Sequence, residues 1–186
     1  TPRPQGLPIY QSAWQDGQRA VRLIRRAAKD RGFDPEKIGA LGFSAGSHMT
    51  MLLGTSSQTP AYQPIDELDK LPCHINLAIP VYTAYALTAG LTGRNTRDGD
   101  GIDVKLSDVF KFDANTCPMA LFHGGTDVYS PNGSIQIYRE LRRMNIPAEI
   151  HLFADRGHGF MGDPNKGENG TAFDHWIDRI TEFMRQ

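Results

Sequence analysis

The sequence has little cysteine, almost no net charge and no long apolar run. The 20 Lys and Arg residues stand against 21 Asp and Glu, a formal net charge of −1. This balance lacks the basic excess that nucleic-acid binding requires, so we expect no nucleic-acid partner. No apolar run approaches the length of a membrane span, and we expect no membrane partner. No signal peptide is visible, but the chain opens at Thr1 rather than Met, so this absence is uninformative.

The only two cysteines, Cys73 and Cys117, each come just before a strand-like apolar run. If those strands are neighbours, both sulfur atoms lie at one edge of the sheet, and a disulfide would be within reach. Two free, half-buried thiols explain the sequence equally well. The sequence therefore leaves both states of the cysteines open.

Strand-like runs alternate with helical patterns along a chain of 186 residues, of which 39% are hydrophobic. Four strands are expected, at residues 37–43, 74–81, 118–123 and 148–153. Helices are expected from residue 12, after residue 44, and over about 134–144 and 171–185. The alternation predicts an α/β fold with a doubly wound, mostly parallel sheet. The long segment at about 82–116 is expected to form a cap on the substrate side.

The first expected helix is amphipathic. Its apolar side chains recur at helical spacing and form one stripe: Trp14, Val21, Ile24 and Ala28. Its basic side chains fall elsewhere on the helix: Arg22, Arg25, Arg26 and Lys29. We expect the stripe to be buried and the basic side chains to form a solvated face.

A Gly-x-Ser-x-Gly motif, Gly42-Phe43-Ser44-Ala45-Gly46, joins an apolar run to a helix-compatible run. The pattern predicts a buried strand that turns sharply into a helix, with Gly42 and Gly46 sparing the crowded turn any side chain. Ser44 would then stand at a helix N-terminus, where the Ala45 N–H and the helix dipole favour an oxyanion. A turn in which Ser44 only caps the helix is the alternative, but the flanking strand and helix patterns favour a nucleophile.

Two more polar residues follow expected strands, Asp127 after the third and His158 after the fourth. The carboxyl ends of parallel strands share one edge of a sheet, so both residues should meet Ser44 there. A serine hydroxyl needs a base to take its proton and an acid to orient that base. The sequence therefore predicts Ser44 as nucleophile, His158 as general base and Asp127 as its orienting carboxylate.

His48 lies one helical turn beyond Ser44, and we expect it to pack rather than to act as a base. Three aspartates, Asp98, Asp100 and Asp103, lack the acidic fifth position and the terminal glutamate of a calcium loop. We expect no catalytic metal and no cofactor.

Three motifs together resemble those of α/β-hydrolases: 42–46, the loop at 123–131, and 157–160. Within that superfamily the chain is similar to bacterial acetyl-xylan and feruloyl esterase-like carbohydrate esterases. The resemblance implies a serine esterase that removes acetyl or feruloyl groups from plant polysaccharide through an acyl-enzyme, and a periplasmic or secreted location. Tyr82 and Tyr85 in the expected cap would then be candidate sugar platforms.

His123 ends the third expected strand beside the loop that carries Asp127. We consider two roles for it: a pocket residue that contacts substrate, and a residue that supports Asp127 from behind. Both are weaker expectations than the roles of the nucleophile, base and acid.

Two other functions remain open. A serine peptidase of the prolyl-oligopeptidase type uses the same three residues, and acetate release from acetylated xylan, set against cleavage of aminoacyl-anilides, separates it from an esterase. A non-catalytic carbohydrate-binding remnant is the second alternative, and a fluorophosphonate probe distinguishes it because the probe labels only an activated serine.

One feature departs from a complete α/β-hydrolase. Such a protein has further strands before the first helix, and a loop among them, commonly with His-Gly-Gly, supplies a second oxyanion donor. The triplet at 123–125 follows the nucleophile and precedes the acid, so it does not correspond. We therefore expect 1–186 to be the C-terminal part of one α/β-hydrolase domain, with the N-terminal strands on a separate polypeptide after cleavage.

Overall fold

The computed structural model describes residues 6–88, 104–160 and 176–185. Its four strands form one parallel sheet in the order β1 (Gly39–Phe43), β2 (Leu77–Val81), β3 (Met119–Gly124) and β4 (Ala148–Phe153). The four α-helices are α1 (Gln11–Arg31), α2 (Ala45–Thr55), α3 (Asn132–Arg143) and α4 (Trp176–Phe183), and a 3-10 helix spans Glu67–Lys70. The predicted α/β fold with a parallel sheet is confirmed.

Some sequence expectations lie outside the described residues. These are the middle of the expected cap, 89–103, and the start of the last helix, 171–175. The three aspartates at 98, 100 and 103 lie there too.

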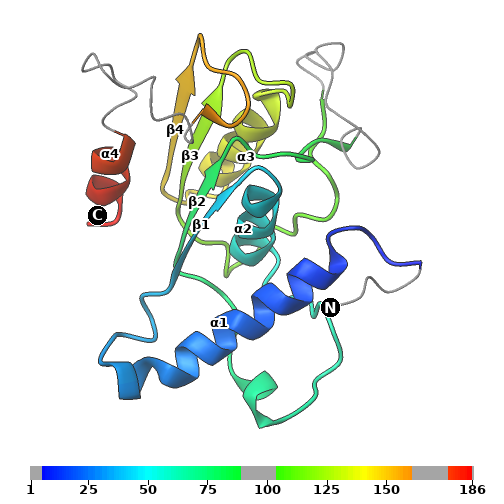
Figure 1. The fold of residues 1–186 in the computed structure, drawn as a ribbon, viewed down its shortest axis with the longest axis vertical. Helices are drawn as coiled ribbons and strands as arrows, with labels where there is room; N and C mark the ends of the chain where they lie inside the picture. The colour runs from blue at the N-terminus through cyan, green and yellow to red at the C-terminus, as the bar shows by residue number, and fades with distance from the viewer. Residues whose placement is uncertain (1–5, 89–103, 161–175, 186) are drawn as a thin grey trace.

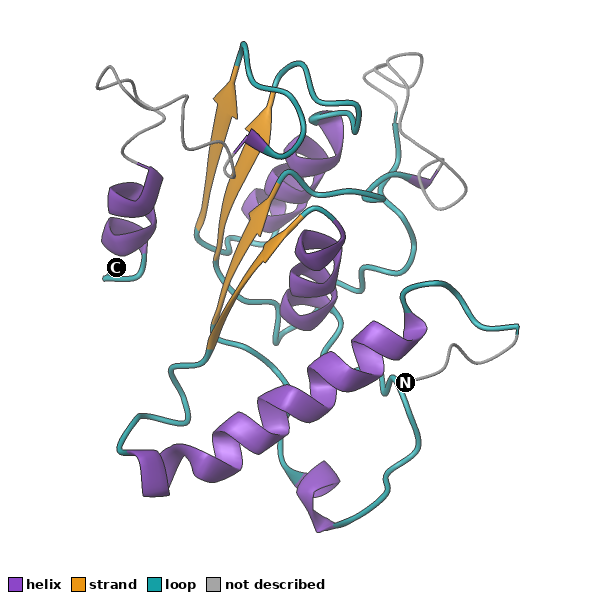
Figure 2. Cartoon of the chain, viewed as in Figure 1, coloured by secondary structure: helices purple, strands orange, loops and turns teal. Residues whose placement is uncertain are grey.

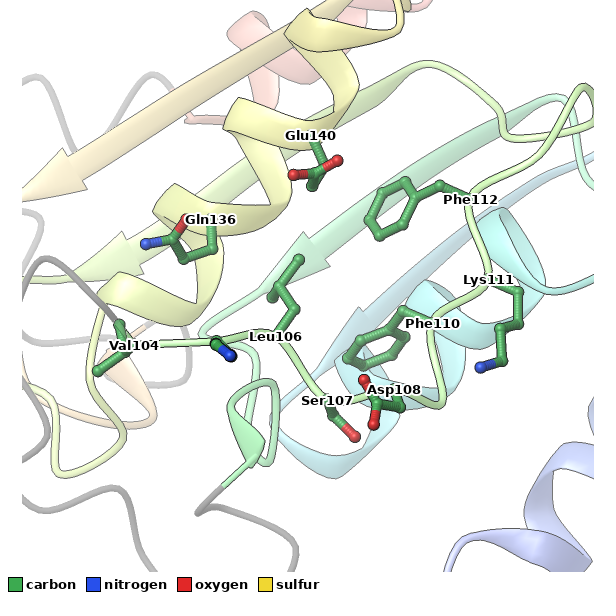
Figure 3. A pocket seen from close by; sticks show the side chains of 10 residues that line it. Val104, Leu106, Ser107, Asp108, Phe110, Lys111, Phe112, Gln136 and Glu140 are labelled. Carbon is green, nitrogen blue, oxygen red and sulfur yellow. The ribbon is translucent and has the colours of Figure 1, made fainter.

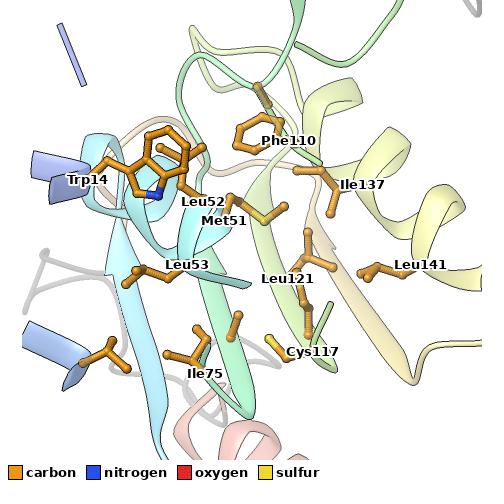
Figure 4. Packing of buried hydrophobic residues seen from close by; sticks show 14 of the residues in the cluster. Trp14, Met51, Leu52, Leu53, Ile75, Phe110, Cys117, Leu121, Ile137 and Leu141 are labelled. Carbon is orange, nitrogen blue, oxygen red and sulfur yellow. The ribbon is translucent and has the colours of Figure 1, made fainter. Parts of the chain in front are cut away.

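Helices cover both faces of the sheet (Figures 1 and 2). On one face, α2 packs on β1 and β2, α3 packs on β3 and β4, and α1 packs against α2. The core on this face includes Met51, Leu52, Leu121, Ile137 and Leu141 (Figure 4). On the other face, α4 packs on β2 and β3 through Ile79, Val81, Phe122, Ile180 and Phe183. The two central strands are therefore buried on both sides, which explains why they read as nearly continuous apolar runs.

The buried stripe of α1 contains two polar members. Its buried residues follow the helical repeat: Trp14, Gln18, Val21, Arg25 and Ala28. Ile24, expected in the stripe, is 46% exposed. Arg25, expected in the solvated face, is buried and donates to the carbonyl oxygens of Pro72 at 2.6 Å and His74 at 2.9 Å. The expectation was wrong at both positions. Arg25 is buried because it binds the backbone that leads into β2.

The strand before Ser44 is more exposed than the buried strand that the sequence predicts. Among the described strands β1 lies at an edge and pairs with β2 alone. Its side chains Leu41 and Phe43 are 44% and 39% exposed. The apolar composition of β1 is therefore not explained by contacts within the described residues.

Both cysteines are free thiols, so the disulfide alternative is not adopted. Cys73 donates its S–H to the carbonyl oxygen of Ser57 at 3.4 Å. Burial raises the pKa of Cys117 to about 12 and also raises the pKa of Cys73. Because thiolates are the reactive form, neither thiol is suited to be a nucleophile at neutral pH.

Candidate active site

The turn between β1 and α2 holds Ser44 in a strained conformation, with φ 55° and ψ −117°. Gly42 makes this turn feasible, because a Cβ atom there would lie 2.2 Å from the Gly46 carbonyl oxygen and 2.4 Å from Thr50 Oγ1. Gly46 has open space around its own Cβ position. The sequence argument about crowding is therefore right for Gly42 and wrong for Gly46.

Three side chains from different strand ends form a chain of hydrogen bonds. Ser44 Oγ lies 2.7 Å from His158 Nε2. His158 Nδ1 lies 2.9 Å from Oδ2 and 3.0 Å from Oδ1 of Asp127. A carboxylate only accepts, so Nδ1–H donates to Asp127, and in the neutral ring Nε2 is left to accept the Ser44 hydroxyl proton. This geometry is what a base-activated serine nucleophile requires.

The Asp127 side chain is fully buried, and its surroundings favour the charged form. Burial alone would raise the pKa of Asp127, but hydrogen bonds from His123, the Tyr129 N–H and His158 outweigh it and lower this pKa. The Tyr129 N–H donates to Oδ1 at 2.8 Å. Asp127 is therefore a carboxylate near neutral pH, as an orienting acid must be.

Two tyrosine rings lie against the imidazole of His158. The centroids of Tyr82 and Tyr129 are each 4.9 Å from that of His158. The Tyr129 hydroxyl donates to the Tyr85 hydroxyl at 3.3 Å. Tyr82 and Tyr85 both have positive φ, 39° and 60°. The candidate sugar platforms are thus beside the hydrogen-bonded chain, with Tyr82 buried against the ring and Tyr85 half-buried.

Tyr129 is the site residue that sequence reasoning missed. Its ring, its N–H and its carbonyl all serve the site, the last by accepting from His123 Nε2 at 3.0 Å. Two of these three contacts are made by backbone atoms, which the residue type does not reveal. Its position two residues after Asp127 was the one available signal.

His123 is fully buried. It therefore lies behind Asp127 and does not face the surface on which a substrate would lie. Its Nε2 lies 3.5 Å from Asp127 Oδ2, so of the two expected roles the one that remains open to it in this structure is support of the carboxylate. Ala45 is exposed as the first residue of α2, where the N–H has no intrahelical acceptor.

His48 packs in an aromatic environment, as expected. Its ring centroid lies 5.1 Å from that of Phe110 and 5.3 Å from that of Tyr10. Neither ring nitrogen has a hydrogen-bond partner within the described residues. Burial lowers the pKa of His48 to about 4, although the nearby backbone of Ala84 and Tyr85 acts in the opposite direction.

Residues of the 104–112 segment, within the expected cap, line a pocket of about 340 Å³ together with α3. Figure 3 shows Gln136 and Glu140 of α3 on one side and Phe110 and Phe112 on the other. Neither the nucleophile nor the base nor the acid of the predicted site lines this pocket.

No group of three or more His, Cys, Asp or Glu side chains is arranged to hold a metal ion in residues 6–88, 104–160 and 176–185. Over the same ranges, every helix is too short or too polar to cross a membrane.

Two curated proteins resemble this chain over part of their length. Endo-1,4-beta-xylanase B from Butyrivibrio fibrisolvens is 28% identical over 164 residues, which are 82% of this chain and 25% of that protein. Esterase LipQ from Mycobacterium tuberculosis is 36% identical over 73 residues, 39% of this chain and 17% of that protein. The chain thus spans a quarter or less of either protein.

Solved structures share the fold. The apo form of Thermogutta terrifontis esterase 2 matches with a TM-score of 0.74 and 22% identity, covering 94% of this chain and 65% of that chain. An acetyl ester-xyloside bifunctional hydrolase from Caldicellulosiruptor lactoaceticus matches with a TM-score of 0.71 and 22% identity, covering 100% and 67%. An alpha/beta hydrolase enzyme from a deep-sea metagenome library matches at 0.66 and 22%, covering 92% and 62%.

Two family models match overlapping parts of the sequence. The dienelactone hydrolase family model matches residues 105–186. The BD-FAE model matches residues 5–141, which is more than half of the chain. The chain therefore has the α/β-hydrolase fold and belongs to the BD-FAE family.

Proposed function

We propose that this chain carries the catalytic residues of a serine carboxylic-ester hydrolase. The observation that supports this most is the 2.7 Å contact from Ser44 Oγ to His158 Nε2, continued at 2.9 Å from His158 Nδ1 to Asp127. The positive φ of Ser44 at the start of α2 adds to it, because that conformation turns the hydroxyl outward.

In the proposed reaction, Ser44 Oγ attacks the ester carbonyl carbon while His158 Nε2 takes the hydroxyl proton. The carbonyl oxygen becomes an oxyanion that accepts a hydrogen bond from the Ala45 N–H. The alcohol leaves with the proton from His158, and the acyl group stays on Ser44. Water then attacks this acyl-enzyme by the same route, which releases the carboxylic acid and restores the serine.

The proposed substrate is an acetylated or feruloylated plant polysaccharide. Two proteins similar to this chain support this choice: one is named as a xylanase, and the other as an acetyl ester-xyloside hydrolase. The half-buried Tyr85 ring, which packs on Tyr129 next to His158, offers a platform for a sugar. With such a substrate we propose a periplasmic or secreted location.

We also propose that the N-terminal strands of the same protein, on a separate polypeptide, pair with β1 and supply a second oxyanion donor. The exposed apolar side chains Leu41 and Phe43 on an edge strand support this, because exposed apolar edges are prone to pairing. The structures that match are longer, with 62–67% of their length covered. Hydrogen exchange in the native protein tests it: protection of the β1 amides that point away from β2 is expected, and rapid exchange there would contradict the proposal.

The first experiment is hydrolysis of p-nitrophenyl acetate by the native protein and by Ser44→Ala, with labelling by a fluorophosphonate probe. Activity and labelling should both disappear in the variant. Ser57→Ala is the matched control, because the buried Ser57 Oγ has no partner in the described structure. Equal activity in Ser44→Ala and the native protein would overturn the proposed nucleophile, and absence of labelling would favour the carbohydrate-binding alternative.

A second comparison addresses substrate class. Acetate release from acetylated xylan and ferulate release from feruloylated arabinoxylan should both exceed cleavage of aminoacyl-anilides. Preference for the anilides would support the peptidase alternative instead.

A further inference from the structure

We infer that His123 is a positioning residue, which holds the Asp127 carboxylate and its loop in the orientation that His158 requires. This inference rests on the proposed function, because it assigns a role within the same reaction. His123 touches neither the proposed nucleophile nor the substrate, so its effect passes through Asp127.

The contacts of His123 use both ring nitrogens. Nδ1 lies 2.8 Å from Ser134 Oγ, in the first turn of α3. Nε2 lies 3.0 Å from the Tyr129 carbonyl oxygen and 3.5 Å from Asp127 Oδ2. Both Ser134 and His123 are fully buried, so bulk water does not compete for these hydrogen bonds.

These partners select one tautomer of the neutral ring. The Tyr129 carbonyl can only accept, so Nε2 carries the hydrogen, and Nδ1 then accepts the Ser134 hydroxyl proton. The Nε2–H is thereby held on the side of Asp127 and its loop. The backbone N–H of Tyr129 in turn donates a hydrogen bond to Asp127 Oδ1. His123 thus holds Tyr129 through its carbonyl oxygen, and the N–H of the same residue holds the carboxylate.

The loop that carries Asp127 is also tied to the loop that carries His158. The Thr126 N–H donates to the Arg156 carbonyl oxygen at 3.0 Å. A Cβ atom on Gly124 would lie 2.2 Å from that same oxygen. A shift of the Asp127 loop would therefore move Arg156, two residues before His158. By holding the Asp127 loop in place, His123 also affects the position of His158.

Four titratable residues of the described ranges lie around Asp127. His123 comes from β3, His158 from the loop after β4, Tyr82 directly follows β2, and Tyr129 lies in the loop of Asp127 itself. The pKa of Tyr82 is raised by burial and by the negative charge of Asp127. Loss of the His123 donor removes one of the interactions that keep Asp127 charged, so its effect should grow as the pH falls.

The test compares His123→Phe with His123→Gln in the native protein. Phe keeps the ring volume and removes both polar contacts, whereas Gln retains an N–H donor near the position of Nε2. We expect kcat for p-nitrophenyl acetate to fall about 10- to 100-fold in His123→Phe with KM nearly unchanged. His123→Gln should recover most of the loss, and the acid limb of the pH profile should move to higher pH in His123→Phe. A purely structural role predicts the opposite order, because Phe fills an apolar core better than Gln.

Matched controls complete the experiment. His151→Gln changes a histidine on β4 that stacks on Phe122, and it should leave kcat unchanged. Ser134→Ala should lower kcat, whereas Ser107→Ala should not, because the buried Ser107 hydroxyl has no partner in the described structure. Equal kcat in His123→Phe and His123→Gln, or an unmoved acid limb, would overturn the inference. If the native protein were no more active than Ser44→Ala, the proposed function itself would be wrong.

Discussion

A Cβ atom on Gly42 would lie 2.2 Å from the carbonyl oxygen of Gly46, far inside van der Waals contact. Gly42→Ala must therefore displace the backbone of the first turn of α2. We expect a loss of about 3 kcal/mol in the free energy of unfolding, measured by chemical denaturation, because overpacking forces such shifts. Gly46→Ala is the control, since its Cβ meets open space and Ala favours a helix. Equal stability of the two variants would contradict the account of the turn.

The second prediction concerns Asp127→Asn. An amide can donate to His158 Nδ1 and so favour the tautomer in which Nε2 cannot accept from Ser44. We expect kcat to fall about 10⁴-fold with a small change in KM, since the corresponding Asp-to-Asn change in a serine protease triad has that effect. Asp155→Asn is the control, because Asp155 is exposed and lies three residues before His158. A loss of less than tenfold in kcat for Asp127→Asn would argue that the carboxylate does not orient the base.

The third prediction concerns Arg25, whose guanidinium binds the carbonyl oxygens of Pro35, Pro72 and His74. Arg25→Met keeps an apolar stem but leaves these acceptors without their charged donor. We expect a loss of about 3 kcal/mol in the free energy of unfolding. Arg26→Met, at an exposed neighbour, should change it by less than about 0.5 kcal/mol. Similar values for both variants would mean that the buried contacts of Arg25 add little.

Arg25 also marks the limit of what the sequence could predict. The apolar periodicity of α1 identified Trp14, Val21 and Ala28, but the complete stripe includes Gln18 and Arg25. These polar side chains are buried because they bind backbone of the 56–76 connection, as in the 2.9 Å bond from Gln18 to Thr59. Hydropathy carries no information on distant carbonyl groups, so such members of a buried face cannot be read from it.

The candidate site was more predictable than its surroundings. Ser44, Asp127 and His158 each follow an expected strand, and a parallel sheet brings such ends to one edge, so their hydrogen bonding follows from topology. The contributions of Tyr129 depend on backbone atoms, which carry no sequence signature. The edge position of β1 could not be read either, because an apolar strand looks the same whether its partner strand lies within the chain or elsewhere.

The last prediction concerns pH and His48, which is 3% exposed and unpartnered in the described structure. Its folded-state pKa of about 4 lies below the ordinary value of about 6.5. Between these values the unfolded chain binds a proton that the folded chain does not, so stability is full above about pH 6.5 and is lost as the pH falls through 4. The loss amounts to about 3 kcal/mol.

His48→Phe removes this titration and keeps a ring among Tyr10 and Phe110. Denaturant unfolding at pH 7, 5.5 and 4.5 should show the native protein losing stability faster than this variant as the pH falls. His74→Gln is the control, because it removes a histidine that is only partly buried, and the loss of stability in acid should persist in it. Parallel curves for the native protein and His48→Phe would mean that water or a rotated ring solvates the imidazolium. In that case burial of His48 would not be what weakens the fold in acid.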